Sequence, residues 1–184
     1  MILLKPVLAG LLAIGAATTA SGAITVVGNS DGALCYESAK RAQTSATALA
    51  TCTKALEEGA LSKRDKTATF VNRGIVHVHR GDVALGLADY ETALAMDANL
   101  AEAHTNRGIA LWRTNGSLTD ALAALDRGIA LGTAEPEVAH FMRAVVHEDL
   151  GNLENAYLDY KRALEIAPGW ELAQVELSRF VVPS

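Results

Sequence analysis

The side chains of this sequence that could do chemistry are five histidines, two cysteines and scattered carboxylates. His77 and His79 are two residues apart, so on a helix they face different ways. His140 and His147 lie two turns apart on one helical face, but no cysteine or carboxylate completes a zinc ligand set around them. The sequence contains no nucleophile-elbow serine and no glycine-rich phosphate loop. It therefore predicts no catalytic residues, no metal and no cofactor.

The N-terminal residues have the pattern of a signal peptide, which is removed during export. Lys5 supplies a short positive start, an apolar stretch covers 7–17, and small residues follow. Two cleavage sites are acceptable, after Ala20 and after Ala23. An uncleaved anchor is the alternative, although the stretch is shorter than the roughly 20 residues of a membrane span. We therefore assign 1–23 to a signal peptide and expect an exported, soluble and periplasmic product.

The two cysteines, Cys35 and Cys52, are an even number in a chain expected to be exported. Such a pair predicts a disulfide bond. A closed loop of this length would add about 3 kcal/mol in the chain-entropy treatment. Two buried thiols are the alternative.

Composition narrows the class of partner. The formal net charge is −5, half of the residues are hydrophobic and one-fifth are charged. This balance suits a helical protein packed through small side chains. Because no cluster of basic residues is present to grip phosphates, we expect no nucleic-acid partner.

A regular spacing organises the rest of the chain. Asn72-Arg73-Gly74 recurs 34 residues later as Asn106-Arg107-Gly108, and Arg143-Ala144 opens a third copy. Each copy continues into a glycine-containing turn and a second segment with helical apolar periodicity. A period of this length indicates stacked helical hairpins, which usually provide binding surfaces rather than reaction centres.

The expected boundaries follow from turn and capping residues. Residues 24–32 are predicted to be a flexible N-terminus, and Lys63–Lys66 a charged, solvated connector. The predicted helical domain, 33–184, consists of a degenerate hairpin at 33–60, three full hairpins at about 67–100, 101–135 and 137–170, and a capping helix at 170–180. Such a stack needs a terminal cap because its last apolar face would otherwise contact water.

The residues within each hairpin resemble the tetratricopeptide repeat. The third hairpin agrees best, with the family's small, large and terminal positions filled by Ala144, Ala156, Tyr160, Ala163-Leu164 and Pro168. The first and second hairpins carry Gly74, Gly86 and Tyr90, and Gly108, Ala121 and Leu125, but lack the terminal proline. The resemblance implies an all-α fold, a right-handed α-solenoid of antiparallel hairpins.

The small residues have a packing role that is independent of the family. Gly74 facing Gly86, and Ala144 facing Ala156, let two helices approach at the short end of the usual 8–10 Å range. A larger side chain at these positions should force the helices apart.

Three arginines occupy positions where the family usually has an apolar residue. Asp89 lies 16 residues after Arg73, and Asp159 lies 16 after Arg143, each on the facing helix. We predict two structural ion pairs, Arg73–Asp89 and Arg143–Asp159, because half-buried charges need partners. A basic ligand-binding row is the alternative. Arg107 faces Ala124 instead and must pair with Asp126 or with a neighbouring hairpin.

In the family, the first helix of each hairpin lines the concave side of the solenoid. The resemblance therefore implies a partner-binding surface made by Asn72, Ile75, His79, Asn106, Ile109, Trp112, Arg113, Phe141 and Val145. Asn72 and Asn106 could bond an extended peptide backbone, since an amide offers a donor and an acceptor together. Trp112 and Phe141 are the candidate aromatic anchors, although Trp112 could instead pack against the next hairpin.

The sequence as a whole predicts a non-catalytic interaction module of the cell envelope. It would bind a protein or peptide and retain no stable membrane span after signal cleavage. One alternative is a self-assembling structural component, a homo-oligomer paired through the closing helix or Trp170. Another is an enzyme that depends on a small ligand or a metal.

Overall fold

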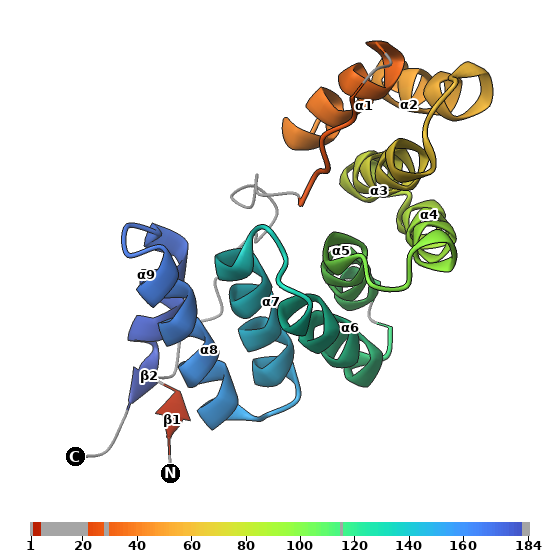
Figure 1. Ribbon diagram of the computed structural model, residues 1–184. Coiled ribbons are helices and arrows are strands. Elements are labelled where there is room, and N and C mark those ends of the chain that lie inside the picture. The colour runs from red at the N-terminus through yellow and green to blue at the C-terminus, as the bar shows by residue number, and fades with distance from the viewer. Residues whose placement is uncertain (1, 5–21, 28–29, 115, 182–184) are drawn as a thin grey trace. The chain divides into compact units, whose positions relative to one another are not determined.

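The computed structural model describes residues 2–4, 22–27, 30–114 and 116–181 (Figure 1). They form two compact units that divide between Ala134 and Glu135, and residues 2–4 belong to the second unit. The predicted apolar part of the signal peptide, 7–17, lies outside the described residues. Among the helices that are described, none has the length and apolarity needed to cross a membrane.

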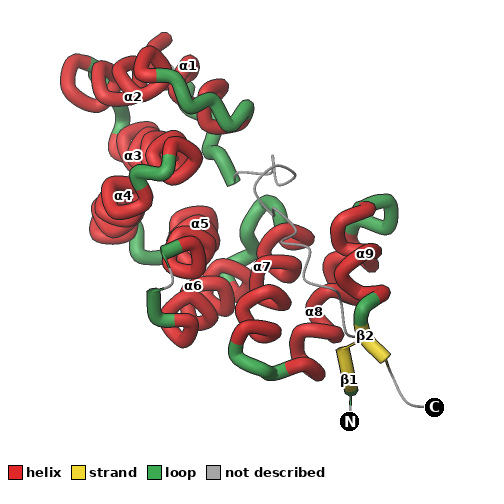
Figure 2. Tube along the Cα trace, turned by 180° about the vertical axis from the view of Figure 1, so that it is seen from behind, coloured by secondary structure: helices red, strands yellow, loops and turns green. Residues whose placement is uncertain are grey.

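The first unit is built from helices that pair into hairpins joined by short loops (Figure 2). Its helices are α1 (Ser30–Lys40), α2 (Ala46–Glu58), α3 (Lys63–Arg80), α4 (Val83–Met96), α5 (Ala101–Arg113) and α6 (Leu118–Ala130). The pairs are α1 with α2, α3 with α4, and α5 with α6. Since α3 also packs against α1 and α5, the first helices of the three hairpins are neighbours in this unit.

The second unit contains one further hairpin and its cap. It consists of α7 (Pro136–Asp149), α8 (Leu153–Ile166), α9 (Glu171–Ser178) and the short antiparallel strands β1 (Leu3–Leu4) and β2 (Phe180–Val181). The Phe141 ring lies 5.3 Å from the ring of Tyr160, edge-on, and 4.8 Å from the ring of Trp170. These aromatic contacts join α7 to α8 and to the start of α9. The fold is thus an all-α solenoid of repeated hairpins, as predicted.

The start of α3 differs from the expected charged connector. Lys63–Lys66 form the first turn of this helix, which begins after Ser62. The Ser62 hydroxyl accepts a hydrogen bond from the Asp65 N–H at 3.1 Å and donates one to the Asp65 carboxylate at 2.8 Å. A serine cap with an acidic residue three positions later satisfies the free N–H groups of a helix start. This cap lets a strongly charged sequence begin a helix.

Small residues lie where the helices of each hairpin cross. A Cβ atom added to Gly74 would lie 2.5 Å from Cε1 of Tyr90 and 3.1 Å from the carbonyl oxygen of Gly86. At Gly108 it would lie 2.9 Å from the carbonyl oxygen of Ala121. The facing backbones therefore leave no room for a methyl group, which is the close crossing that the sequence predicted.

We expect Gly74→Leu to lower the free energy of unfolding by at least about 2 kcal/mol, within the range of overpacked cores. The new side chain must displace Tyr90 or separate α3 from α4. Urea denaturation followed by circular dichroism measures the change. Gly169→Leu is the matched control, because nothing lies within 4 Å of a Cβ there. Equal stability of the two variants would contradict this account of the crossing.

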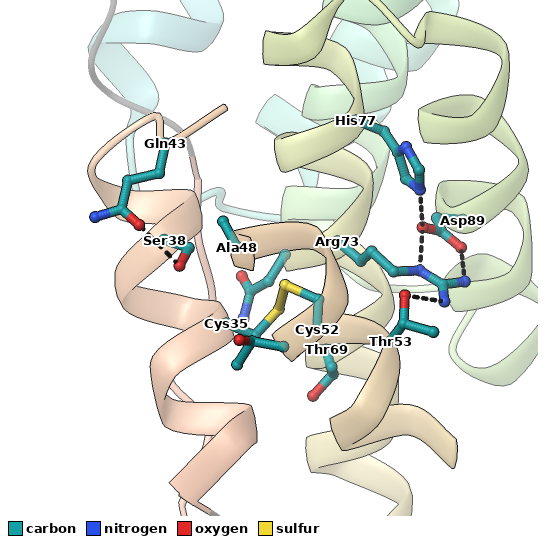
Figure 3. The surroundings of a disulfide bond; sticks show 12 residues. Cys35, Ser38, Gln43, Ala48, Cys52, Thr53, Thr69, Arg73, His77 and Asp89 are labelled. Carbon is teal, nitrogen blue, oxygen red and sulfur yellow. Dashed lines mark hydrogen bonds and ion pairs between the residues drawn. A yellow bond between two sulfur atoms is a disulfide. The ribbon is translucent and has the colours of Figure 1, made fainter. Parts of the chain in front are cut away.

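The predicted disulfide joins α1 to α2 (Figure 3). Cys35 and Cys52 are fully buried, and their Cα atoms lie 4.7 Å apart. The bridge closes a sequence separation of 17 residues. It ties together a hairpin whose buried side chains are mostly small: Gly32, Ser38, Ala39, Ala48 and Ala55. Because such side chains bury little apolar area, the covalent link supplements a thin core.

Reduction of this disulfide should lower the free energy of unfolding by about 3 kcal/mol, the value expected for a loop of this size. The test compares urea midpoints of the wild-type protein with and without reductant. The Cys35→Ala/Cys52→Ala variant serves as the control, because reductant should leave its midpoint unchanged. A wild-type midpoint that is insensitive to complete reduction would refute the stabilising role.

Candidate functional site

The candidate binding surface of the first unit lies on α3 and α5. We call it the α3–α5 face and define it by these side chains: Asn72, Ile75 and His79 of α3 with Asn106, Ile109, Trp112 and Arg113 of α5. The two helices contact one another directly. The structure therefore brings the predicted site residues of the first two full repeats together.

Asn72 makes the most specific contact of this face. Its side-chain oxygen accepts a hydrogen bond from the Ile24 N–H at 2.8 Å, and its side-chain nitrogen donates one to the Ile24 carbonyl at 2.7 Å. One amide thus satisfies both backbone groups of a residue in a non-helical stretch, 22–27. Asn72 is fully buried by this contact and its surroundings. The sequence predicted this kind of backbone bond for Asn72, and here the backbone belongs to the same chain.

Asn106 behaves differently from Asn72. Its side-chain nitrogen donates to the Glu102 carbonyl of its own helix at 2.9 Å. It also lies beside Gly22, where an added Cβ would come within 2.9 Å of that nitrogen. Asn106 therefore borders the path of residues 22–27.

The remaining residues of the face vary in exposure. Ile75 is buried, His79, Ile109 and Trp112 are partly buried, and Arg113 is exposed. Burial lowers the pKa of His79, and the nearby Arg113 lowers it further. His79 is therefore neutral near pH 7, and Arg113 is the cation of this face.

Phe141 and Val145 lie in the second unit, on α7. Phe141 is fully buried between Tyr160 and Trp170, and Val145 is also buried. Phe141 therefore presents no ring surface to a partner, which corrects its assignment as an aromatic anchor. The sequence could not distinguish the two roles, because a core aromatic and a surface anchor have the same spacing on a helix.

The first predicted ion pair is present and joins α3 to α4, the two helices of one hairpin. Arg73 donates to both carboxylate oxygens of Asp89, at 2.8 and 2.7 Å, and reaches Thr53 of α2 at 3.4 Å (Figure 3). The hydrogen bond with Asp89 raises the pKa of Arg73 against the opposing effect of burial. His77 lies 4.0 Å from the same carboxylate, and burial lowers its pKa. Arg73 thus serves packing within the first unit.

The second predicted ion pair is arranged in the same way. Arg143 donates to both oxygens of Asp159, each at 2.7 Å, and His140 lies 2.9 Å from one of them. Burial alone would raise the pKa of Asp159, but hydrogen bonds from Arg143 and His140 outweigh it and lower the pKa. The participation of His140 was not predicted. The signal was its place three residues before Arg143, on the same helical face.

Arg107 pairs with Glu91 of α4, in the neighbouring hairpin. A partner in a neighbouring hairpin is one of the two that the sequence allowed. Arg107 thus also links adjacent repeats. Among the described residues, no three histidine, cysteine, aspartate or glutamate side chains gather in a way that could hold a metal ion.

The lowered pKa of Asp159 predicts a pH dependence of stability. Its charged form is stabilised in the folded state, so this contribution is complete above the unfolded pKa of about 3.9. It is lost as the pH falls through the lower folded pKa. Asp159→Asn should lower the free energy of unfolding by about 2 kcal/mol at pH 7, a value within the range for hydrogen bonds to charged groups.

Urea unfolding at pH 7, 4, 3 and 2 measures this effect. The difference in the free energy of unfolding between wild type and Asp159→Asn should narrow below pH 4, because protonated wild-type Asp159 resembles the neutral amide. A gap that stays constant down to pH 2 would show that the charge of Asp159 contributes nothing.

Comparisons with known proteins agree with these hairpins. A family sequence model described as "Tetratricopeptide repeat" matches residues 71–137, and a second with the same description matches 138–170. No curated protein matches the chain.

Solved structures share the fold. The first tetratricopeptide domain of Spaghetti (RPAP3), bound to an HSP90 peptide, is similar with a TM-score of 0.57 and 25% identity, over 61% of this chain and 90% of that one. A crystal structure of MamA gives a TM-score of 0.61 at 20% identity, over 80% of this chain and 79% of that one. The family matches adjoin one another and coincide with the hairpins from α3 to α8. The chain therefore belongs to the tetratricopeptide repeat family.

Proposed function

We propose that this chain is a non-catalytic interaction module that binds an extended segment of a partner protein on the α3–α5 face. The fold of repeated hairpins supports this function, because stacked repeats present continuous binding surfaces. The solved structure of the RPAP3 domain, which has the same fold, holds a peptide.

The hydrogen-bonding geometry of Asn72 carries the proposal. A side-chain amide that bonds the N–H and the carbonyl of one residue recognises an extended backbone without regard to its side chains. Asn72 makes both bonds to Ile24 at 2.7–2.8 Å. The face can therefore hold an extended peptide, and its specificity comes from the neighbouring side chains Ile109, Trp112 and Arg113.

The charge of the face indicates the kind of partner. Arg113 is its cation, while Ile75, Ile109 and Trp112 are apolar. This composition favours an extended apolar peptide with few acidic groups. It differs from a Lys-rich surface that holds a peptide carboxylate.

The setting that we propose is the cell envelope, after export. The N-terminal sequence pattern supports export, and the disulfide supports an oxidising compartment, where such bonds persist. A protein or peptide of the envelope is then the partner.

Truncation of Trp112 should reduce partner recovery at least about tenfold, as expected for an aromatic residue that dominates an interface. The measurement is a crosslinked pull-down from an envelope extract, quantified by mass spectrometry, with wild type and Trp112→Ala compared. Thr92→Ala, an exposed site on α4, is the control. Equal recovery of every protein by Trp112→Ala and Thr92→Ala, with similar melting curves, would rule out this face as the binding surface.

A further inference from the structure

Residues 22–27 lie along the first unit, next to the N-terminal half of α3 (Figure 1, the orange-red coil next to α1). Gly22 is beside Asn106 of α5, Ile24 is bonded to Asn72, and the Val27 N–H lies 3.4 Å from the Asp65 carboxylate. This path runs from α5 toward the start of α3. It differs from the flexible N-terminus that the sequence predicted for 24–32.

The side chains of this stretch alternate between the protein and the solvent. Val26 is buried and Ile24 partly buried against the core of the first unit, whereas Thr25 and Val27 are exposed. Val26 fits because Gly32 of α1 lacks a side chain, since a Cβ there would lie 2.6 Å from Cγ1 of Val26. Alternation with period two is the pattern of an extended strand. Residues 24–27 thus alternate as an extended peptide bound on a surface would.

We propose that residues 22–27 are a built-in occupant of the peptide-binding face, and that a partner binds by displacing them. Signal cleavage after Ala20 keeps the whole stretch, and cleavage after Ala23 keeps residues 24–27, which make the bonds to Asn72 and Asp65. The inference rests on the proposed function. Asn72 has committed both of its polar groups to Ile24, so a second backbone can use this amide only after Ile24 has left. The occupant also indicates the chemistry of the partner, an extended segment with a small residue followed by apolar residues at every second position.

A cavity next to Ile24 explains how a partner could bind the face more tightly than residues 22–27 do. It measures about 600 Å³, and its lining consists of Ile24, Thr67, Ala68, Met96 and Leu100 with the charged residues Lys63, Arg64 and Asp97. Ala68 lies one helical turn before Asn72 on α3. Ile24 forms part of the cavity wall and leaves this space open. A partner with a larger apolar residue in the place of Ile24 fills the space and buries more apolar area.

Tethering determines the strength of the competition. An occupant on a short tether has an effective concentration in the millimolar range. The apparent dissociation constant of a competitor rises in inverse proportion to the fraction of molecules whose site is open. Weakening the occupant should therefore tighten the binding of a free peptide, although the peptide's own contacts are unchanged.

The experiment uses the full 184-residue chain and a fluorescent, end-blocked peptide of sequence GAITVV, which copies residues 22–27. Fluorescence anisotropy compares wild type, Ile24→Asp and the matched control Thr25→Asp. The two variants add the same charge to the same stretch, at a contacting position and at an exposed one. We expect Ile24→Asp to bind the peptide at least about tenfold more tightly than wild type, and Thr25→Asp to bind like wild type.

Two further comparisons test the contacts. Adding Asn72→Ala to Ile24→Asp should weaken peptide binding at least about tenfold, because the backbone bonds are lost. A peptide with phenylalanine in the place of Ile24, GAFTVV, should bind Ile24→Asp more tightly than GAITVV by filling the cavity. If the phenylalanine peptide binds less tightly, the role assigned to the cavity is refuted.

The possible outcomes separate the two proposals. If wild type and Ile24→Asp bind the peptide equally well, peptide binding stands and displacement of a built-in occupant is refuted. If Ile24→Asp binds neither peptide while it remains folded, peptide binding on this face is refuted and residues 22–27 are a structural part of the first unit. Hydrogen exchange without added peptide tests whether residues 22–27 occupy the face. The Ile24 amide should be protected from exchange in wild type and should exchange freely in Asn72→Ala. An unprotected wild-type amide overturns the inference.

Discussion

The two helices of each hairpin approach so closely that a methyl group on Gly74 would overlap the Tyr90 ring. This close approach fixes the geometry of the repeat, because the backbones themselves set the distance. It aligns the first helix of one hairpin with the first helix of the next, as α3 lies against α5. The candidate binding face exists because these helices are neighbours. A glycine with no chemistry of its own thus positions the side chains of the candidate binding face.

Close packing of small residues buries polar groups, and each of these requires a partner. Arg73 and Arg143 are held by carboxylates on the facing helix, and Arg107 by a carboxylate of the adjacent hairpin. The arginines that interrupt an apolar pattern thereby become links within and between repeats. Asn72 follows the same rule, since its buried amide is satisfied by a backbone residue. A buried amide of this kind stabilises whichever extended backbone it meets, and this property connects the stability of the first unit with its capacity to bind.

On our proposal, one surface of the first unit holds either residues 22–27 or a partner. Residues 22–27 complete its core with Val26 and satisfy Asn72. A partner that takes their place must make the same bonds to Asn72 and bury additional apolar area. The cavity next to Ile24 has room for this area. In this proposal, the affinity for a partner depends on a stretch of chain that contributes no side chain to the α3–α5 face. In the second unit, Phe141 is part of an aromatic core with Tyr160 and Trp170 and has no comparable role.

The sequence by itself determined the repeat, the family resemblance, the disulfide and the pairing of Arg73 with Asp89. The repeat, the resemblance and the ion pair follow from spacing, because residues that recur in phase on helices must meet the same neighbours in each hairpin. The disulfide follows from an even number of cysteines in a chain expected to be exported. The start of α3 was also encoded locally, in Ser62 and Asp65, but the charge of Lys63–Lys66 obscured it. Only the tertiary structure decided which aromatic residues are buried and where residues 22–27 lie. The bonds between Ile24 and Asn72 span 48 positions, and no periodicity within a helix specifies a contact at that distance. The contact depends on the shape of a surface that exists only after the hairpins have stacked.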